Sequence, residues 1–242
     1  MRWGIFSDVH SNLEALQAVV KAYKPERVDT YLCLGDIVGY GANPLECIQI
    51  TREISRNTIA GNHDRATAGL FSLEYFNHWA KEAVLWTRQR LDSPSRNFLA
   101  SLQLINQNDD FILVHGSLNQ PEEFNYIFDL FEASATFSLL ERKICFIGHT
   151  HIAGAFIQDR KQKAFYQNEV SLKLRQDYRY IINVGSVGQP RDGNNQASYC
   201  VFDSEKQEVA VKRIDYDIKS AQEKILAAGL PPLLASRLSA GR

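Results

Sequence analysis

Residues with metal-binding side chains recur in five short motifs along the chain. The motifs contain five of the six histidines, together with aspartate and asparagine. Imidazole nitrogen and carboxylate or amide oxygen are ligands that suit manganese, iron or zinc. Each motif follows or closes an apolar run, so we expect all of them to lie at strand ends and to meet in one pocket. The motifs are Asp8-Val9-His10, Gly35-Asp36, Gly61-Asn62-His63-Asp64, Val114-His115-Gly116 and Gly148-His149-Thr150-His151.

The elements that must position these motifs alternate between strand and helix in the first part of the chain. The order βαβαβ favours a parallel sheet. Residues 66 to 104 have helical periodicity, interrupted at Ser93-Pro94. Because they separate two metal motifs, we expect a helical, cap-like insertion there. The predicted elements before them are strand Trp3–Ser7, helix Leu13–Ala22, strand Thr30–Leu34, helix Leu45–Ser55 and strand Thr58–Ala60.

Strands dominate the second half, and their mostly short connections favour a mixed or largely antiparallel arrangement. Two sheets flanked by helices, with the site between the sheets, fit this order. The predicted strands are Phe111–Val114, Ile144–Gly148, Ala153–Gln158, Ala164–Gln167, Val170–Leu174, Tyr180–Val184, Ser198–Asp203 and Val209–Arg213. The predicted helices are Leu130–Leu140, Ile218–Ala228 and Leu233–Leu238.

The first predicted helix begins shortly after His10. Ser11 and Glu14 have the spacing of a capping box, which indicates that Ser11 caps this helix. The free amides and the dipole at its N-terminus would add positive potential beside the metal motifs. That potential suits a bound phosphate.

Length and composition predict a single α/β domain over residues 1–242. A chain of 242 residues that is 45% hydrophobic can bury one sizeable core. The four cysteines form no CxxC pair, and Cys33 and Cys145 lie in strand runs, so we expect reduced, buried thiols. Because no targeting segment or apolar run long enough for a membrane span is evident, we expect a cytoplasmic protein.

The charge balance restricts the class of partner. A net charge of −1 gives no overall footprint for nucleic acid or for an acidic membrane surface. Any polyanion must therefore be bound locally, and we expect a small phosphorylated substrate. A homo-oligomer stays open.

The ordered set D-x-H, G-D, G-N-H-D, V-H-G and G-H-x-H resembles the motifs of the calcineurin-like metallophosphoesterase superfamily. The resemblance covers residues 8 to 151 directly, and five motifs in this order are highly specific. The later run from Asn183 to Gly193 resembles a bacterial branch of predicted phosphoesterases that includes diadenosine tetraphosphatase-like enzymes. The resemblance implies a four-layer α/β/β/α sandwich of two mixed sheets flanked by helices.

The resemblance also implies a two-metal site in which one carboxylate bridges both ions. Two divalent ions about 3.5–4 Å apart clamp phosphoryl oxygens and lower the pKa of a shared water, the nucleophile of this family. We expect Mn²⁺, with Fe, Zn, Ni and Co as alternatives. The family pattern assigns Asp8, His10, Asp36 and His151 to the first metal, and Asp36, Asn62, His115 and His149 to the second.

His63 follows a metal ligand in its motif but is not itself a ligand in the family. The resemblance gives it the role of protonating the leaving oxygen or steadying the charge that develops there. General acid assistance is typically worth about 10²–10⁴ in rate. The structural alternative is a turn histidine bonded to the backbone. Asp64 is a candidate to orient the ring.

The residues after the Gly35-Asp36 motif depart from the pattern of the Ser/Thr protein phosphatases in this superfamily. Those relatives carry an aspartate that orients the histidine and an arginine that grips the phosphate. This chain has Gly39 and Tyr40 at those positions. The departure weakens the protein-phosphatase interpretation.

Arg191 is a candidate phosphate contact in the loop from Gly185 to Gly193. Glycines and a proline fix a turn there, and guanidinium groups match phosphate oxygens. A rigid turn with an exposed arginine is the equally weighted alternative. The basic stretch 160–179 fits a solvated hairpin face better than a lip that attracts nucleotides.

Three other residues in the helical stretch fit structural roles. Trp79 and Trp86 recur at helical spacing, which is more typical of core packing than of substrate contact. His78 lies outside every motif and is expected to be structural.

The motifs and the resemblance together predict a dinuclear-metal phosphoesterase that hydrolyses phosphodiester or phosphoanhydride bonds of a small nucleotide substrate. Two alternatives stay open. One is a phosphomonoesterase like the Ser/Thr protein phosphatases, and the other is a non-catalytic protein-binding scaffold of the same fold. Scaffold members tend to have lost ligands, whereas every ligand position is filled here.

Overall fold

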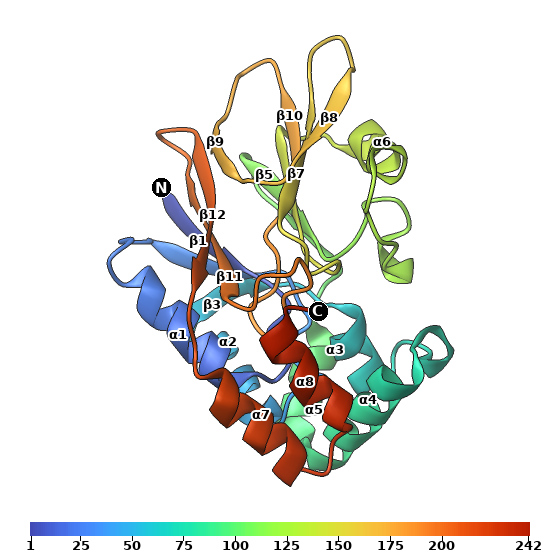
Figure 1. The fold of residues 1–242 in the computed structure, drawn as a ribbon. Helices are drawn as coiled ribbons and strands as arrows, with labels where there is room; N and C mark the ends of the chain where they lie inside the picture. Colours follow the sequence, from blue (N-terminus) through green and yellow to red (C-terminus); the bar gives the residue numbers. More distant parts are fainter.

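Two six-stranded sheets pack face to face at the centre of the computed structural model, which describes all 242 residues (Figure 1). The first sheet is parallel from β3 to β1 and antiparallel beyond β1. It therefore joins the beginning of the chain to a hairpin near its end. Its strands are, in spatial order, β3 (Ser55–Thr58), β2 (Thr30–Cys33), β1 (Arg2–Phe6), β11 (Ala197–Asp203), β12 (Glu208–Ile214) and β9 (Ser171–Lys173).

The second sheet is also mixed. Its strands β5, β6 and β10 are parallel to one another, and antiparallel strands complete both sides. The strands are, in spatial order, β4 (Ile105–Gln107), β5 (Phe111–Val114), β6 (Ile144–Ile147), β10 (Arg179–Asn183), β7 (Gly154–Gln158) and β8 (Ala164–Gln167).

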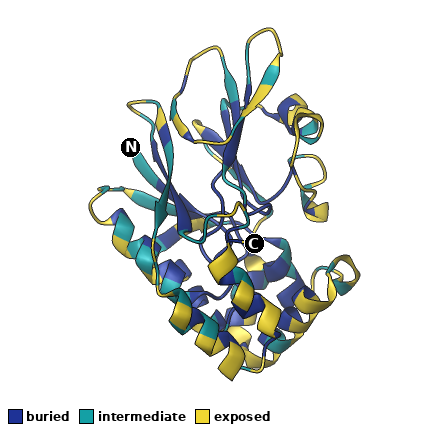
Figure 2. Cartoon of the chain, in the orientation of Figure 1, coloured by how far each residue is buried: buried dark blue, intermediate teal, exposed yellow.

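Helices cover the outer faces of both sheets, and their outward sides are exposed while the central strands are largely buried (Figure 2). The core of the first sheet includes residues of α1, α2 and α5. α6 packs on the outer face of the second sheet. The helices are α1 (Leu13–Tyr23), α2 (Pro44–Ile54), α3 (Asn62–Thr67), α4 (His78–Arg90), α5 (Ser93–Ser101), α6 (Leu130–Leu139), α7 (Ile218–Ala227) and α8 (Pro232–Ala240).

The apolar layer between the sheets is built from side chains of both. Ile5 and Leu32 of the first sheet are buried in one cluster with Phe111 and Phe146 of the second. The Phe202 ring lies 6.0 Å from that of Phe111 and 5.7 Å from that of Phe146. Burial of large side chains from both sides holds the two sheets together. The predicted fold of two packed mixed sheets flanked by helices is confirmed.

One strand was predicted at the wrong place, and another was not predicted. The strand expected at Thr58–Ala60 lies earlier, at β3, and Ile59 forms only an isolated bridge with Gln103. The apolar residues of that run are buried beyond the strand end, so they gave the wrong position. The edge strand β4 was not predicted, because two of its three residues, Asn106 and Gln107, are polar.

The capping prediction was also wrong. Asn12, rather than Ser11, is the N-cap of α1, and its side chain accepts a hydrogen bond of 3.1 Å from the backbone N–H of Ala15. Glu14 does not reach back to the cap, because it forms an ion pair with Lys224 of α7. The helix itself begins at Leu13, as predicted.

A fourth apolar cluster joins α4 to the two C-terminal helices. Tyr40, Ala83, Ile225 and Leu234 are among its buried members. The helical segment 66–104 thus packs against the end of the chain, and its description as a cap-like insertion stays a prediction.

The four cysteines are buried and free, as predicted. None of the helices is both long enough and apolar enough to cross a membrane.

Candidate metal centre

The five motifs follow the carboxyl ends of parallel strands in the two sheets. Such ends lie at one edge of a sheet, where ligand sites of open α/β sheets are found. Following the strands are Asp8 and His10 (β1), Asp36 (β2), Asn62 and His63 (β3), His115 (β5), and His149 and His151 (β6). The predicted convergence of strand-end motifs is therefore present.

The first group of possible metal ligands contains Asp8, His10, Asp36 and His151. All four are buried, and their ligand atoms lie within 4.8 Å of one another. Asp8 Oδ1 is 3.2 Å from His151 Nε2 and 3.7 Å from His10 Nε2. Asp36 Oδ2 is 3.6 Å from His10 Nε2. Two carboxylates and two imidazoles thus face one small volume.

The second group contains Asp36, His115 and His149, also buried and with ligand atoms within 4.8 Å of one another. His115 Nε2 lies 3.3 Å from Asp36 Oδ2. Because Asp36 belongs to both groups, the two groups share one carboxylate. Asn62 begins α3, and its buried Oδ1 has no hydrogen-bond partner.

The hydrogen bonds of three histidines fix which ring nitrogen carries the proton. In each, Nδ1 lies against a backbone carbonyl oxygen, which can only accept, so Nδ1 must be the donor. The Nε2 lone pair then points into the site, as in metal-ligating histidines whose other nitrogen is held by a carbonyl. The pairs are His10 with Val38 at 3.1 Å, His115 with Leu34 at 2.7 Å and His151 with Gln189 at 2.6 Å.

The inward-facing atoms fit divalent cations. His10 Nε2 and His151 Nε2 are 3.1 Å apart, and with both protons on Nδ1 these two acceptors cannot hydrogen-bond each other. Asp8 Oδ1 and His115 Nε2 are buried without any partner. Buried acceptors without donors are costly, and a bound cation would satisfy all of them. The donor set of oxygen and imidazole nitrogen suits first-row divalent metals.

The pKa values of the metal-site residues depend on burial and on the charges of their neighbours. Burial alone would raise the pKa of Asp36, yet neighbouring histidines, His115 first, hold it below its ordinary value. Burial would lower the pKa of His115, but the Asp36 and Asp8 carboxylates raise it to about 9. Burial lowers the pKa of His149 to about 3 and that of His151 to about 4. The carboxylates therefore favour a proton on His115, and a bound metal would displace that proton, because neutral imidazoles and ionised carboxylates are the forms that bind metals.

Two glycines allow the strand-end loops to approach these carboxylates. A Cβ atom added to Gly61 would lie 2.0 Å from Asp36 Oδ1, and one added to Gly148 would lie 2.5 Å from Asp8 Oδ2. No side chain fits at either position without displacing a carboxylate.

The family model of the calcineurin-like phosphoesterase superfamily domain matches residues 1–207. The chain belongs to this superfamily. It is 40% identical to the uncharacterized protein MJ0912 of Methanocaldococcus jannaschii, over 98% of this chain and 97% of that protein.

Solved structures agree with this membership. A metallophosphoesterase from Sphaerobacter thermophilus is 39% identical, with a TM-score of 0.90 over 100% of this chain and 99% of that one. The hypothetical protein PH1004 from Pyrococcus horikoshii OT3 shares the fold, at 18% identity and a TM-score of 0.78 over 100% of this chain and 98% of that one.

Within this calcineurin-like phosphoesterase, His63 lies beside the metal groups with an unusual environment. Its backbone N–H donates to Asp36 Oδ1 at 2.8 Å, and its buried Nδ1 has no partner. Burial lowers the pKa of His63 well below its ordinary value, so the imidazole is neutral at pH 7. An approaching phosphate anion would raise that pKa.

The expected role of Asp64 in orienting His63 was wrong. Its carboxylate instead accepts hydrogen bonds from the backbone N–H groups of Ile37 at 2.9 Å, Val38 at 3.3 Å and Gly61 at 3.1 Å. Asp64 therefore fastens the loop after β2 to the start of α3. The hydrogen bonds of its carboxylate thus hold two ligand-bearing loops together.

Gly39 lies directly against His63. Its φ is +97°, and an added Cβ would lie 2.4 Å from His63 Nδ1. The position that carries an acidic partner for the histidine in the protein phosphatases thus has neither the space nor the backbone conformation for one in this chain.

Arg191 lies beside the metal groups. Its guanidinium donates to Gln189 Oε1 at 2.7 and 3.2 Å and lies 5.6 Å from the centre of the Tyr40 ring. The Tyr40 ring is in turn 4.7 Å from that of His10. The backbone N–H of Arg191 also donates to the His151 carbonyl at 3.2 Å.

The remaining candidates lie away from the metal groups. Trp86 donates from Nε1 to the Ala228 carbonyl at 2.9 Å and so has the expected packing role. The core role expected for Trp79 was wrong, because its side chain is exposed on the outer side of α4. His78 is exposed and lies 3.7 Å from Glu82. Strands β10 and β7 pair from Arg179 and Gln158 at one end to Asn183 and Gly154 at the other. The site lies at the Asn183 end, so the basic stretch, which ends at Arg179, leads into the opposite end of the second sheet.

Sequence reasoning missed two residues near the metal groups. The Tyr126 ring stacks on that of His149, with centroids 3.8 Å apart and planes inclined by 15°. Gln189 is buried, and its Nε2 donor has no partner. Tyr126 lies in an irregular loop and Gln189 in a turn, so neither carries a periodic signal. Proximity of Gln189 to Arg191 in the sequence was the only clue.

The backbone at the site is strained. Twelve non-glycine residues have positive φ, from 49° to 68°, and seven of them belong to the strand-end loops of the site. Left-handed conformations cost about 1–2 kcal/mol for most L-residues, and such strain is concentrated at functional sites. The seven are Asp8, His10, Ser11, Asp36, Tyr40, His149 and His151.

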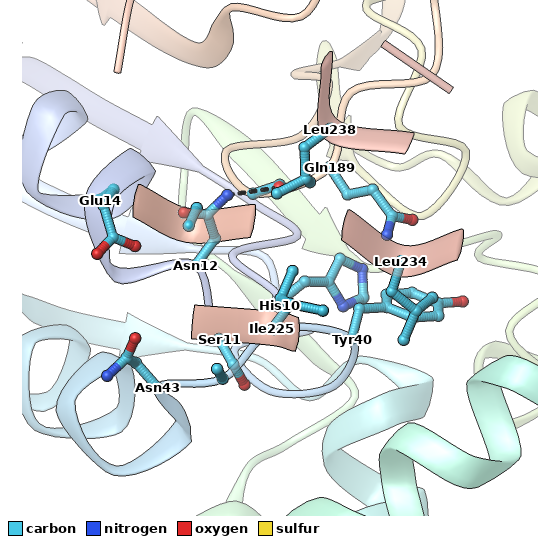
Figure 3. A pocket seen from close by; sticks show the side chains of 14 residues that line it. His10, Ser11, Asn12, Glu14, Tyr40, Asn43, Gln189, Ile225, Leu234 and Leu238 are labelled. Carbon is cyan, nitrogen blue, oxygen red and sulfur yellow. Dashed lines mark hydrogen bonds between the residues drawn. The ribbon is translucent and has the colours of Figure 1, made fainter. Parts of the chain in front are cut away.

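A small pocket lies behind His10, between the loops of the first sheet and the C-terminal helices (Figure 3). Its lining includes Tyr40, Gln189, Leu234 and Leu238. Its volume of about 10 Å³ is close to that needed by one water molecule. The C-terminal helices therefore close directly over the back of the metal centre.

Proposed function

We propose that this calcineurin-like phosphoesterase hydrolyses phosphodiester or phosphoanhydride bonds of a small nucleotide substrate with two divalent metals. The observation that carries the proposal is the pair of buried ligand groups that share Asp36. Two ions can be held close together only where a carboxylate lies between them, and such a pair is suited to phosphoryl transfer.

The ligand roles follow the two groups. Asp8, His10, Asp36 and His151 would hold the first ion. Asp36, Asn62, His115 and His149 would hold the second. When bound, two such ions would polarise the phosphoryl oxygens and lower the pKa of a shared water. We propose Mn²⁺ as the native metal, with Fe, Zn, Ni and Co able to occupy the same donor set.

The protein residues around the ions would then position the substrate. The Arg191 guanidinium is placed to contact phosphate oxygens, because it lies beside the metal groups and is not paired with any carboxylate. The His63 imidazole would take up a proton from solvent when the phosphate approaches and donate it to the leaving oxygen. The absence of an acid at Gly39 and of an arginine at Tyr40 disfavours phosphopeptides as substrates.

The first test combines metal analysis of purified protein with turnover of bis-p-nitrophenyl phosphate in Mn²⁺. We expect about two metal ions per chain and measurable hydrolysis. In Asp36→Asn the shared charge is lost, so one metal and essentially all hydrolysis should disappear while the circular dichroism spectrum is retained. Two bound metals and near-normal turnover in this variant would contradict the bridging role.

The second test ranks substrates. kcat/KM for dinucleoside polyphosphates, cyclic nucleotides and bis-p-nitrophenyl phosphate should exceed that for phosphoserine and phosphothreonine peptides with the same metal. A preference for the peptides would favour the phosphomonoesterase alternative. Metal binding without turnover of any of these compounds would favour a scaffold. A cytoplasmic location and a possible homo-oligomer stay predictions from the sequence.

A further inference from the structure

Arg237 extends from the C-terminal helix α8, which lies outside the part of the chain matched by the family model. Its Nε donates to the backbone carbonyl of Arg242 at 2.9 Å, and the side chain is half-buried. Its neighbour Leu238 and the residue one turn earlier, Leu234, line the same small pocket as His10. Arg237 therefore belongs to the helix that closes over the metal centre.

The loop that carries Arg191 is bonded to this helix. The backbone N–H of Gly193 donates to the Gly241 carbonyl at 3.0 Å, and Asn195 Nδ2 donates to the Ser239 carbonyl at 3.2 Å. These bonds bring the Arg191 loop and the end of α8 into contact. The two arginines thus come from adjoining segments. Arg191 lies 5.6 Å from the centre of the Tyr40 ring, and Tyr40 packs in one cluster with Leu234 of α8.

Neither guanidinium is paired with an aspartate or a glutamate. Arg191 donates to the neutral amide oxygen of Gln189, and Arg237 donates to a main-chain oxygen of Arg242, the last residue. The acid next to Arg191 in the sequence, Asp192, is already paired with Arg213. Burial, and next to it the charge of Arg191, lowers the pKa of Arg237. Two half-buried guanidinium groups with no acidic side chain between them repel each other, and an anion between them would relieve that repulsion.

A further donor points to an anion at the same place. Gln189 is buried, uses its Oε1 to accept from Arg191, and leaves its buried Nε2 donor without an acceptor. Unsatisfied buried donors are rare and call for a partner. A phosphate oxygen would satisfy the Gln189 amide and both guanidinium groups together.

We propose that Arg191, Arg237 and Gln189 form a subsite for a second phosphate, adjoining the phosphoryl group held at the metal centre, so that the favoured substrates are phosphoanhydrides. The inference rests on the proposed function and narrows its substrate class. In the hydrolysis, a water oxygen bonds to the phosphorus at the metals. The bond to the bridging oxygen breaks, and the phosphate in the subsite leaves with the electron pair and takes up a proton.

Binding of two nucleotides that differ by one phosphate tests the subsite. AMP and the non-hydrolysable α,β-methylene-ADP are titrated calorimetrically into the Mn²⁺-loaded protein. The wild type should bind α,β-methylene-ADP at least tenfold more tightly than AMP, since the subsite would add charge-assisted hydrogen bonds to the second phosphate. Arg237→Gln should remove most of this difference, and Arg237→Lys should restore part of it.

The matched control is Lys219→Gln, which removes one positive charge from the exposed side of the neighbouring helix α7. It should leave the preference for α,β-methylene-ADP as in the wild type. A loss of preference in this control would show that only net charge matters, and an unaltered preference in Arg237→Gln would show that Arg237 takes no part. Either result overturns the inference.

Kinetics separate this inference from the function on which it rests. In Arg237→Gln the loss of kcat/KM with ADP should exceed the loss with bis-p-nitrophenyl phosphate, which has a single phosphate, by at least tenfold. If the wild type hydrolyses the diester and Arg237→Gln loses the same factor of kcat/KM with both substrates, the subsite is overturned and the phosphoesterase function stands. A wild type that hydrolyses neither would overturn the proposed function, and the calorimetric comparison would still decide the subsite.

Discussion

His63 is held by rings rather than by a hydrogen bond to its side chain. Its imidazole lies 4.5 Å from the Tyr40 ring and 4.9 Å from each of the rings of His10 and Phe76, measured between centroids. Packing against aromatic rings fixes the plane of the imidazole and excludes water from it. Packing therefore fixes the position of the ring, and its protonation state can change when the substrate binds.

Removal of this ring should depend on the leaving group. His63→Ala should keep both metals, because His63 belongs to neither ligand group. We expect kcat to fall by about 10²–10⁴ with nucleotide substrates, whose leaving oxygens need a proton, and much less with p-nitrophenyl esters. Steady-state kinetics with metal analysis checks this. Equal impairment on both substrate types would indicate phosphate positioning instead, and loss of a metal would make His63 a ligand.

Gly39 offers a second test of the same position. Gly39→Ala should press a methyl group against His63 Nδ1 and so displace the ring. Activity should fall about as far as in His63→Ala while metal content is retained. Gly69→Ala is the matched control, because Gly69 also has positive φ, +84°, but nothing within 4 Å of the added Cβ.

Both glycine variants should lose about 1 kcal/mol of stability from the strained backbone, and Gly39→Ala should lose more because of its contact with His63, as measured by denaturant unfolding. Only Gly39→Ala should lose activity. An active Gly39→Ala enzyme would show that the ring can move without consequence.

At the scale of elements, the metal motifs could be predicted because each stands where an apolar strand ends. The strand pattern and the ligand types together locate Asp8, Asp36 and His115, and the structure brings them within one site. The sheet order could not be read from these patterns, because pairing joins strands as distant as β1 and β11.

Other parts of the site have no signal of their own in the sequence. The apolar stripe of α8 shows that the helix is buried but not which surface it covers, so Arg237 could not be placed. Asp64 and Asn12 are polar residues near helix starts whose partners lie elsewhere in the chain, at Ile37 and Gly188 for example. Contacts of this kind depend on tertiary structure, which local propensity does not contain.

At the scale of the whole molecule, metal binding should stabilise the fold. A ligand that binds only the folded state adds about 2.7 kcal/mol at a free concentration 100 times its dissociation constant. For a protein of this size that corresponds to a rise in Tm of about 5–10 °C. Differential scanning calorimetry with Mn²⁺ and with a chelator should show this rise, and Asp36→Asn should show a smaller one. A Tm that is the same with Mn²⁺ and with a chelator would contradict the assignment of the two ligand groups.

The metal-free protein should lose stability in acid. The pKa values of His149 and His151 are about 3 and about 4 in the fold, against about 6.5 in an unfolded chain. Between pH 6.5 and 4 the unfolded chain therefore binds more protons at both residues, and the free energy of unfolding falls as the pH falls.

Asp64 opposes this trend, because burial raises its pKa to about 7, and His115 opposes it too, because the Asp36 and Asp8 carboxylates raise its pKa to about 9. His63 acts in the same direction as His149 and His151, because burial lowers its pKa as well. Urea unfolding of chelator-treated protein at pH 7 and pH 5 should thus show lower stability at pH 5. Equal or greater stability at pH 5 would mean that these imidazoles are not buried in the neutral form.

The left-handed backbone of the strand-end loops restricts how such a site can change over evolution. Aspartate, asparagine, histidine and glycine are the residues that tolerate positive φ best, and the first three are also metal ligands. At positions such as Asp8, His10 and His149, the conformation and the coordination therefore select the same small set of amino acids. Exchanges within that set preserve the loop even when they alter the metal preference, whereas a β-branched residue would lose both at once. Descendants of this chain can consequently drift among metals, or lose them, without first losing the fold.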